Sequence, residues 1–383
     1  MHRNYMSFGS FILYLIIVLP AANSFATLRY KSRTVDTDSV SVSKGSYQES
    51  TGFSTYLPII DNNYHRPQIA FQVIEDGGYY QYVYKVNDDG SGLRNLTINP
   101  NAIEFDWSPD GSKIAFGANW PGNWEIYVMN EDGSGVSRLT YESHQDYSPV
   151  WSPDGSRIAF ASKRSGSAQI YTMAPDGTDV IAITSLPDGC NEPHWSPDSS
   201  LLAFVCGLVS HDDAEVYLSH SDGTGLIRLT QNYFYEEIEG WSPDGHKILF
   251  LSNRDHGDEL YKNDAYVMEA DGTDPVRLTQ GGLVQAAVWS PDATKIAVSD
   301  FSGFPSLLIM NPDGTASTPV LCQSELIGTD NPAWSPDGTR IAYTPSSSTG
   351  GEPLGIYVVN INSSNCRLIV ALDTYDPQWR PEK

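Results

Sequence analysis

The segment Trp107-Ser108-Pro109-Asp110-Gly111-Ser112-Lys113-Ile114-Ala115-Phe116 decides the fold, because it recurs along most of the chain. Trp-Ser-Pro-Asp occurs six times, and a degenerate copy, Trp-Arg-Pro-Glu, stands near the C-terminus. The successive intervals are 44, 44, 46, 48, 45 and 45 residues, and the copies begin at Trp107, Trp151, Trp195, Trp241, Trp289, Trp334 and Trp379. Self-similarity at a period of about 40 to 50 residues is typical of propellers and related repeat proteins.

Each repeat contains the same four short segments of strand-forming sequence. The tryptophan segment is followed by an apolar run such as Lys113–Phe116 and then by a second run such as Glu125–Met129. A polar turn, Asp132–Gly135, leads to a last short segment, Ser137–Thr140. Four strands joined by polar turns predict one antiparallel propeller blade for each repeat. An open solenoid of stacked repeats is the structural alternative.

The two ends of the repeat region favour a closed ring over a solenoid. The first repeat begins at Gln68-Ile69-Ala70-Phe71 and lacks a tryptophan strand, whereas Tyr375–Trp379 is a spare strand after the last repeat. If the spare strand pairs with the first, both termini complete one blade and no edge strand is left exposed. The sequence therefore predicts an all-β fold, a single seven-bladed β-propeller spanning residues 66–383.

Most of the repeated residues have architectural explanations. In Pro-Asp-Gly, proline presets φ, aspartate can bond back to the backbone, and glycine accepts a positive φ. Two copies, Asp198-Ser199 and Asp292-Ala293, lack the glycine, and we expect looser turns or another turn type there. The tryptophans are expected to pack between neighbouring blades, because a residue required in every blade serves the architecture.

The N-terminal residues are typical of an export signal. Residues 1–26 contain His2 and Arg3, an apolar run from Phe8 to Pro20, and small residues before Thr27, where the mature chain would begin. An uncleaved anchor is the alternative, although the apolar run is short of the roughly 20 residues that span a bilayer. Residues 27–65 are rich in serine, threonine and tyrosine and predict a flexible stalk. The protein is thus expected to be secreted or periplasmic.

The formal net charge of −24 makes nucleic acid an unfavourable partner, since no segment concentrates lysine and arginine. An acidic surface suits cationic patches on other proteins, divalent cations, or simply solubility. We expect a monomer without a membrane span that binds a protein, peptide or glycan at its blade loops or channel mouth.

The repeat resembles that of the TolB-type β-propeller family. The resemblance rests on Trp-Ser-Pro-Asp-Gly followed by Lys/Arg-Ile-Ala-Phe, Ile-Tyr-x-Met, Asp-Gly and Arg-Leu-Thr, and it runs from about residue 66 to the end. The third repeat also carries Ser162-Lys163-Arg164-Ser165-Gly166 and Gln169-Ile170-Tyr171, similar to the family's Ser-x-Arg-x-Gly and Ile-Tyr segments. The resemblance implies the propeller fold. The family includes a periplasmic protein-interaction module that docks an envelope lipoprotein at the mouth of a six-bladed propeller.

Acidic residues just before the tryptophans form the best candidate for a functional site. The tryptophan strand is innermost in propellers of this type, so its beginning should open on one mouth of the channel. The candidates, each within five residues upstream of a tryptophan, are Glu104, Asp146, Glu192, Glu236, Glu237, Glu239, Asp330 and Asp376. They could hold a divalent cation such as Ca²⁺ or receive a basic peptide or loop. The alternative is a solvated acidic rim.

Catalysis is the less favoured function. The nucleophile elbow Gly-x-Ser-x-Gly does not occur in the sequence. Some propeller lyases that cut acidic sugars use histidines and a metal ion at the channel, and a metal-assisted carbohydrate-active enzyme is therefore the alternative function. The candidate histidines fall at different points of their repeats: His194, His211, His220, His246 and His256. Of these, His194 alone lies in a tryptophan strand, and we predict a non-catalytic binding protein.

Four cysteines in an exported chain suggest disulfides. A hairpin register that places Trp195 opposite Leu201 also places Cys190 opposite Cys206, and directly opposed residues can be bridged. We predict a Cys190–Cys206 disulfide. We expect Cys322 and Cys366 to be unpaired, because they lie at opposite ends of outer strands in neighbouring blades.

Two long loops break the symmetry of the repeats, Leu208–Ala214 and Asn253–Asp264. Loops longer than a blade requires are places where a partner can be recognised, although neutral drift explains extra length equally well.

Overall fold

The computed structural model describes residues 66–75, 80–120, 122–207, 214–232, 234–257, 259, 262–302, 306–322, 325–326, 331–345, 355–362 and 365–382. The predicted signal segment and stalk lie outside these residues. In the part of the chain that is described, no helix is long and apolar enough to cross a membrane.

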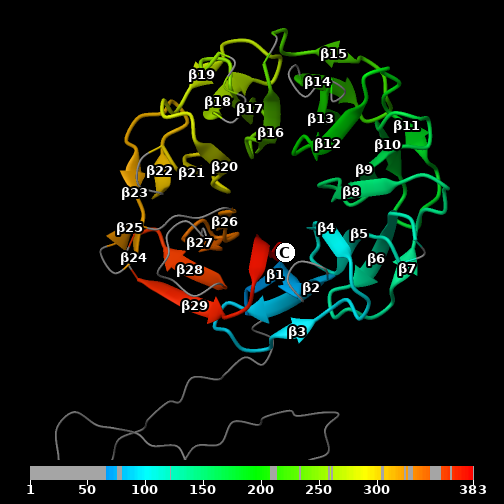
Figure 1. Ribbon diagram of the computed structural model, residues 1–383, viewed down its shortest axis with the longest axis horizontal. Coiled ribbons are helices and arrows are strands. Elements are labelled where there is room, and N and C mark those ends of the chain that lie inside the picture. The colour runs from blue at the N-terminus through cyan, green and yellow to red at the C-terminus, as the bar shows by residue number, and fades with distance from the viewer. Residues whose placement is uncertain are drawn as a thin grey trace, which may run out of the picture. The chain divides into compact units, whose positions relative to one another are not determined.

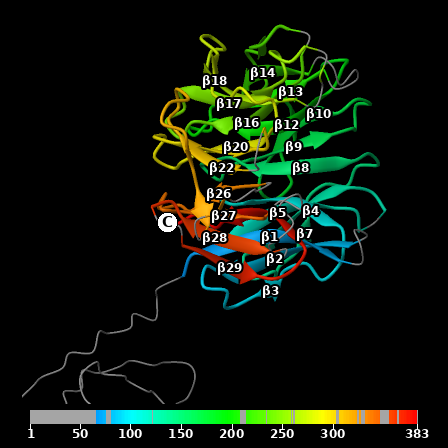
Figure 2. The ribbon, with the colours of Figure 1, turned by 60° about the vertical axis from the view of Figure 1, so that its left-hand side comes forward.

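Seven antiparallel four-stranded sheets are arranged as blades around a central axis (Figures 1 and 2). Blade 1 comprises β1 (Gln68–Glu75), β2 (Tyr80–Asn87), β3 (Arg94–Asn95) and β30 (Thr374–Trp379); blade 2, β4 (Ala102–Trp107), β5 (Lys113–Ala118), β6 (Glu125–Asn130) and β7 (Ser137–Arg138); blade 3, β8 (Asp146–Trp151), β9 (Ile158–Ser162), β10 (Gln169–Met173) and β11 (Ile181–Ala182). Blade 4 comprises β12 (Cys190–Trp195), β13 (Leu201–Cys206), β14 (Glu215–His220) and β15 (Ile227–Arg228); blade 5, β16 (Glu236–Trp241), β17 (Lys247–Ser252), β18 (Asp264–Glu269) and β19 (Val276–Arg277). Blade 6 comprises β20 (Val284–Trp289), β21 (Ile296–Asp300), β22 (Ser306–Met310) and β23 (Thr318–Pro319); blade 7, β26 (Ala333–Trp334), β27 (Arg340–Tyr343), β28 (Ile356–Asn360) and β29 (Cys366–Val370). A hairpin of β24 (Leu321–Cys322) and β25 (Glu325–Leu326) stands between blades 6 and 7 in the chain.

The C-terminal strand closes the ring as the sequence predicts. β30 pairs with β1 in antiparallel register, with Trp379 opposite Ile69 and Thr374 opposite Val73. Figure 1 shows these first and last strands side by side in one blade. The seven-bladed fold and its closure by the C-terminal strand are therefore confirmed, and β1 has a partner on both sides.

The core consists of layers between successive blades, because the middle strands are buried on both faces. β9 and β10, for example, are buried at every position. An aromatic pair recurs in six blades, where a buried second-strand ring stacks on the third-strand tyrosine opposite it. These pairs are Phe71–Tyr84, Phe116–Tyr127, Phe160–Tyr171, Phe204–Tyr217, Phe250–Tyr266 and Tyr343–Tyr357. Stacked rings across a strand pair add to the energy of burial.

The repeated tryptophans join neighbouring blades. All seven are at least nine-tenths buried. In four of them the indole N–H donates to the carbonyl that immediately precedes the tryptophan of the preceding blade. These bonds are Trp195 to Val150, Trp241 to His194, Trp334 to Val288 and Trp379 to Ala333, at 3.0–3.3 Å. Each such tryptophan fixes the distance between two innermost strands.

The turn after each tryptophan is held by its aspartate. Asp110 accepts hydrogen bonds from the Ser108 hydroxyl at 2.8 Å and the Ser112 N–H at 3.0 Å. The two turns without glycine keep the same conformation, with Ser199 at φ 63° and Ala293 at φ 59°. The prediction of looser or different turns is therefore wrong. The aspartate bonds hold these residues in the left-handed region despite their side chains.

We expect Ala293→Gly to stabilise the protein. An alanine at φ 59° is strained, and glycine removes that strain at some entropic cost, so the net gain should be about 0.5–1 kcal/mol. Gly338→Ala is the matched reverse change, because Gly338 occupies the corresponding position at φ 67°. Urea unfolding should shift the two midpoints in opposite directions, and a shift in the same direction would contradict this explanation.

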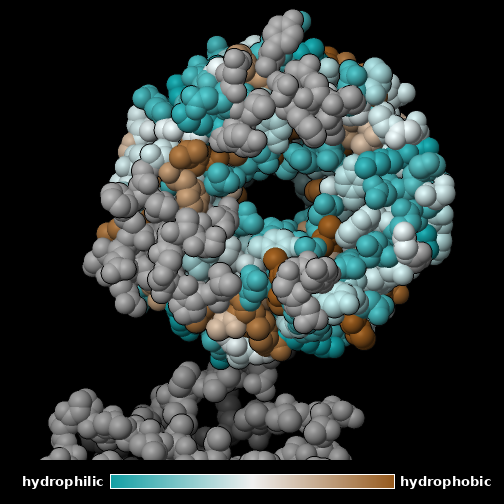
Figure 3. All heavy atoms as spheres, viewed as in Figure 1, coloured by the Kyte–Doolittle hydropathy of each residue, from teal (hydrophilic) through white to brown (hydrophobic). Residues whose placement is uncertain are grey.

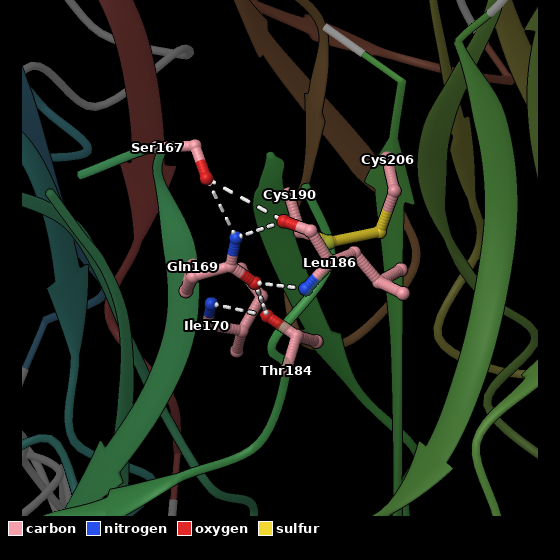
Figure 4. Close-up of a disulfide and its surroundings, with 7 residues drawn as sticks. All are labelled: Ser167, Gln169, Ile170, Thr184, Leu186, Cys190 and Cys206. Atoms are coloured by element: carbon pink, nitrogen blue, oxygen red, sulfur yellow. Dashed lines mark hydrogen bonds between the residues drawn. A yellow bond between two sulfur atoms is a disulfide. The ribbon is translucent and has the colours of Figure 1, made fainter. Parts of the chain in front are cut away.

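The structure contains the Cys190–Cys206 disulfide (Figure 4). Cys190 lies directly opposite Cys206, but Trp195 lies opposite Leu202 and not Leu201, because a bulge between Asn191 and His194 shifts the register. The sequence register was thus right at the cysteines and off by one residue at the tryptophan.

The expectation of an unpaired Cys366 is wrong, since Cys366 is disulfide-bonded. The prediction treated residue 322 as part of a blade's outer strand, whereas it belongs to the additional hairpin β24–β25. The side chain of Cys322 itself lies outside the described residues.

Candidate functional site at one mouth of the channel

In four blades, a β-bulge in the innermost strand places one residue in the left-handed backbone conformation. Glu104, Ser148, Glu192 and Asp376 each stand three residues before a tryptophan and have φ between 50° and 54°. The strand register is interrupted around the same point in all four. Bulges re-aim side chains and are common at functional sites. Three of the four residues at these bulges carry carboxylates.

Carboxylates of this region also bond across to the next blade. Glu104 Oε2 accepts the backbone N–H of Ser148 at 2.7 Å. In blade 5 the bulge falls between Ile238 and Gly240, and Glu239 Oε2 accepts the N–H of Ala287 in blade 6 at 2.8 Å. These bonds fix the two carboxylates on the inner wall of the ring.

Burial is the largest cause of the raised pKa values of these carboxylates, and their mutual repulsion adds to it. Burial raises the pKa of Glu192 to about 7, and the negative charges of Glu237 and Glu104 add to the increase. Burial and the Glu237 charge raise the pKa of Glu239 to about 8, against the opposing bond from Ala287. For Asp376, burial raises the pKa to about 6, with Glu104 contributing in the same direction. Carboxylates from blades 1, 2, 4 and 5 therefore act on each other electrostatically.

Three tyrosines lie among these carboxylates. Burial raises the pKa of Tyr147 to about 12, and the charges of Glu104 and Glu192 add to the increase. Burial and Asp376 raise the pKa of Tyr375 to about 12. Burial and Glu237 raise the pKa of Tyr235, whose hydroxyl donates to Glu237 at 3.5 Å. The carboxylate–tyrosine mouth is defined here as Glu104, Tyr147, Glu192, Tyr235, Glu237, Glu239, Tyr375 and Asp376.

Sequence reasoning missed the tyrosines, although a signal for two of them was present. Tyr147 and Tyr375 both stand four residues before a tryptophan. Figure 3 shows the central opening from one face, bordered mainly by hydrophilic residues. An open channel with a polar wall leaves room for a ligand to reach the inner strands.

Two of the candidate carboxylates have a different environment. Asp146 and Glu236 begin their strands, are fully buried, and form ion pairs with Arg164 at 3.0 Å and Arg254 at 2.7 Å. Arg164 belongs to the Ser-x-Arg segment of the repeat, and its guanidinium lies 4.7 Å from the centre of the Tyr171 ring. These acids complete the interior of a blade, and the structure does not bring them together with the mouth.

The remaining candidates are dispersed. Asp330, His211 and nearly all of the loop 208–214 lie outside the described residues. In the other long loop, His256 Nε2 is 2.6 Å from Asp264 Oδ2, so this histidine packs against its own blade. Burial lowers the pKa of His194 to about 4 and keeps it neutral. Among the described residues, no group of three or more His, Cys, Asp or Glu side chains is arranged to hold a metal ion.

Stability should fall between pH 5 and pH 8. The pKa values of Glu192, Glu239 and Asp376 are raised to about 7, 8 and 6, while unfolded carboxylates titrate near about 4. In this window the native state binds more protons than the unfolded state, so the free energy of unfolding decreases as pH rises.

Thermal melts at pH 5, 6, 7 and 8 measure this effect. The melting temperature should drop by several degrees toward pH 8, and Glu239→Gln should make the drop smaller. A melting temperature that rises steadily from pH 5 to pH 8 would contradict the shared burial of these carboxylates.

The architecture and the site define a class of protein: a closed β-propeller with a cluster of carboxylates and tyrosines on and beside its innermost strands. The model of the TolB beta propeller domain family matches residues 68–192 and 181–302, and the chain belongs to this family. It is 28% identical over 154 residues to a Protein TolB homolog of Chlorobium luteolum. That match covers 40% of this chain and about a third, 33%, of the relative's length.

Solved structures with the same fold include a TolB protein and enzymes. TolB from Acinetobacter baumannii has a TM-score of 0.51 and 17% identity, covering 82% of this chain and 83% of that one. An oligogalacturonate lyase from Vibrio parahaemolyticus has a TM-score of 0.57 and 15% identity, with coverages of 79% and 85%. A puromycin-hydrolyzing peptidase from Mycobacterium tuberculosis has a TM-score of 0.62 and 14% identity, with coverages of 80% and 53%. At these identities the likeness shows the fold alone.

Proposed function

We propose that this protein is a secreted or periplasmic, non-catalytic binding module, and that its carboxylate–tyrosine mouth receives a positively charged segment of a partner protein. The observation that carries the proposal is the mutual coupling of the mouth's carboxylates. The charged neighbours that shift the pKa of Glu192 and Glu239 are themselves carboxylates. A cation brought among them would offset their repulsion and favour the ionised carboxylates.

The tyrosines make the mouth suitable for lysine and arginine side chains in particular. A cation over an aromatic ring gains about 0.5–2 kcal/mol, and more when it is desolvated. Tyr147 and Tyr235 lie close enough to Glu192 for its charge to affect their pKa values. A basic side chain could therefore contact a ring and a carboxylate together.

The proposed location rests on the signal-like N-terminus and on the cysteines. Disulfides persist in oxidising compartments, and the Cys190–Cys206 bridge links two strands in the core of blade 4. Ring closure within one chain is the basis for proposing a monomer.

Titration with a fluorescent Lys/Arg-rich peptide, followed by fluorescence anisotropy, tests the proposal. The triple variant Glu104→Gln, Glu192→Gln, Glu237→Gln should bind the peptide at least about tenfold more weakly, a loss of about 1.4 kcal/mol. The control variant Asp274→Asn, Glu269→Gln, Glu382→Gln removes the same charge from residues away from the innermost strands and should bind like the native chain. Equal loss in the two variants would mean that net charge alone drives binding.

A second assay tests the alternative function, that of a metal-assisted carbohydrate lyase. Incubation with oligogalacturonate and Mn²⁺, with absorbance used to detect an unsaturated product, should give no turnover. Sustained turnover that is lost in the mouth triple variant would replace the binding function with catalysis.

A further inference from the structure

One part of the carboxylate–tyrosine mouth, between blades 1 and 2, has a buried hydrogen-bond acceptor beside it. Burial is the main cause of the raised pKa of Tyr375, and the charges of Asp376 and Glu104 add to it, so these three side chains lie close together. Gln72 of β1 lies opposite Tyr375, and its Nε2 is 3.5 Å from Asp376 Oδ2. We call Gln72, Glu104, Tyr375 and Asp376 the blade 1–2 subsite.

The side-chain oxygen of Gln72 lacks a hydrogen-bond donor. Gln72 is 3% exposed, and its Oε1 accepts no hydrogen bond from any described residue. An ionised carboxylate only accepts hydrogen bonds, so the amide nitrogen is the end that faces Asp376 and the oxygen is the end left over. Buried polar atoms in native proteins almost always have a partner. A molecule that enters the channel, either water or a ligand, can supply this donor.

The carboxylates of the blade 1–2 subsite also lack a cation. Among the described residues, no lysine or arginine forms an ion pair with Glu104 or Asp376, and the charge that shifts the pKa of Asp376 is the negative charge of Glu104. Asp376 Oδ2 receives only two long hydrogen bonds, from the amides of Gln72 and Gln378, both at 3.5 Å. Four buried acids elsewhere each pair with an arginine at 2.6–3.0 Å, namely Glu125, Asp146, Glu215 and Glu236.

We propose that the blade 1–2 subsite selects a primary ammonium group, such as a lysine side chain, from the basic segment of the partner. This inference rests on the proposed function and assigns Gln72 as a residue that determines specificity. A primary ammonium is compact and donates three hydrogen bonds, which Gln72, Asp376 and Glu104 can accept together. The ring of Tyr375 adds a cation–π attraction.

Other organic cations match this set of acceptors less well. The guanidinium of arginine donates from a rigid planar fork that suits the two oxygens of one carboxylate. Here the acceptors come from three strands, with Gln72 on β1, Glu104 on β4 and Asp376 on β30. A quaternary ammonium has no N–H and would leave the Gln72 oxygen without a donor, which is unfavourable for a buried group.

Three fluorescent peptides of equal length and charge test the inference on the native chain. Their cationic residues are all lysine, all arginine or all trimethyl-lysine, and anisotropy is measured at about pH 7.5, where Asp376, with a pKa of about 6, is ionised. The lysine peptide should bind at least about fivefold more tightly than either of the others, which corresponds to about 1 kcal/mol. Equal affinities, the result expected if water alone satisfies the Gln72 oxygen, would overturn the inference.

Two matched variants test the role of Gln72. Gln72→Met should remove the preference for lysine and leave the affinity for the arginine peptide unchanged. Gln68→Met is the control at the other end of β1, because the Gln68 Oε1 also lacks a partner but its Nε2 bonds Asn87 at 3.2 Å and not a carboxylate. The control should keep the preference. A preference that survives Gln72→Met, or that both variants lose equally, would overturn the inference.

The same measurements separate this inference from the proposed function. Equal binding of the three peptides that the mouth triple variant still weakens would refute lysine selection and leave the proposed function intact. No binding of any peptide would refute both. If Gln72→Met unfolds the protein, which a melting curve would reveal, the comparison of the three peptides on the native chain still decides whether the mouth selects lysine.

Discussion

A chain that ends at Asp373, and so lacks β30, is expected not to fold as a stable monomer. β30 carries Trp379, whose indole donates to Ala333 in blade 7 at 3.0 Å, and Gln378, whose amide donates to Phe105 in blade 2 at 2.9 Å. Its removal exposes β1 as an edge and opens a cavity where Trp379 packed. The loss of a buried tryptophan alone costs about 3–5 kcal/mol, a large part of a stability of about 5–15 kcal/mol.

Circular dichroism melts compare this truncated chain with a control that lacks only residues 382–383. The control should melt like the native chain, because both residues follow the closing strand. A synthetic peptide of residues 374–383 should restore cooperative melting when added to the truncated chain. A truncated chain that melts like the control would show that ring closure contributes little.

Arg254→Met is expected to destabilise the protein by about 3–5 kcal/mol, the usual cost of leaving a buried charge without its partner. The Arg254 guanidinium bonds both Glu236 oxygens, at 2.7 and 2.8 Å, and lies 5.0 Å from the ring centres of Phe250 and Tyr266. Glu236 is fully buried. Without the arginine, only the hydrogen bonds from Asn232 at 2.8 Å and Ser252 at 3.1 Å would compensate its charge.

Urea unfolding of two further variants separates charge from packing. Adding Glu236→Gln to Arg254→Met should recover part of the lost free energy, because the unpaired charge disappears. Lys262→Met breaks an exposed ion pair with Glu259 and should cost less than about 1 kcal/mol. An Arg254→Met effect as small as that of Lys262→Met would contradict the importance of the buried pair.

The sequence was sufficient for the fold because the repeat is encoded in local residues. The tryptophan spacing, the apolar runs and the spare strand at Tyr375–Trp379 each carry a separate signal of a closed ring. Turn conformation was harder to predict. Ser199 and Ala293 keep the left-handed conformation of glycine, because the aspartate bonds outweigh the intrinsic preference of a single residue.

The candidate site could be predicted only in part. Distance from a tryptophan selected Glu104, Glu192, Glu239 and Asp376, but it also selected Asp146, which instead pairs with an arginine inside its blade. What separates the two groups is position relative to the bulge. Bulges have no clear signature in the strand sequence, since they arise from the pairing of two strands. Asp106 lay within the same distance of a tryptophan and was not selected, although its carboxylate also accepts a backbone N–H of the next blade, that of Trp151.

Zero-length carbodiimide cross-linking of the Lys/Arg-rich peptide to the native chain, followed by mass spectrometry, tests the central claim most directly. This reagent joins a lysine amine only to a carboxylate that it touches, so the cross-linked residues report where the peptide lies. Cross-links should be concentrated at the mouth, on Glu104, Glu192 and Glu237. Cross-links found mainly on the exposed turn aspartates, Asp132, Asp176 and Asp222, would contradict it.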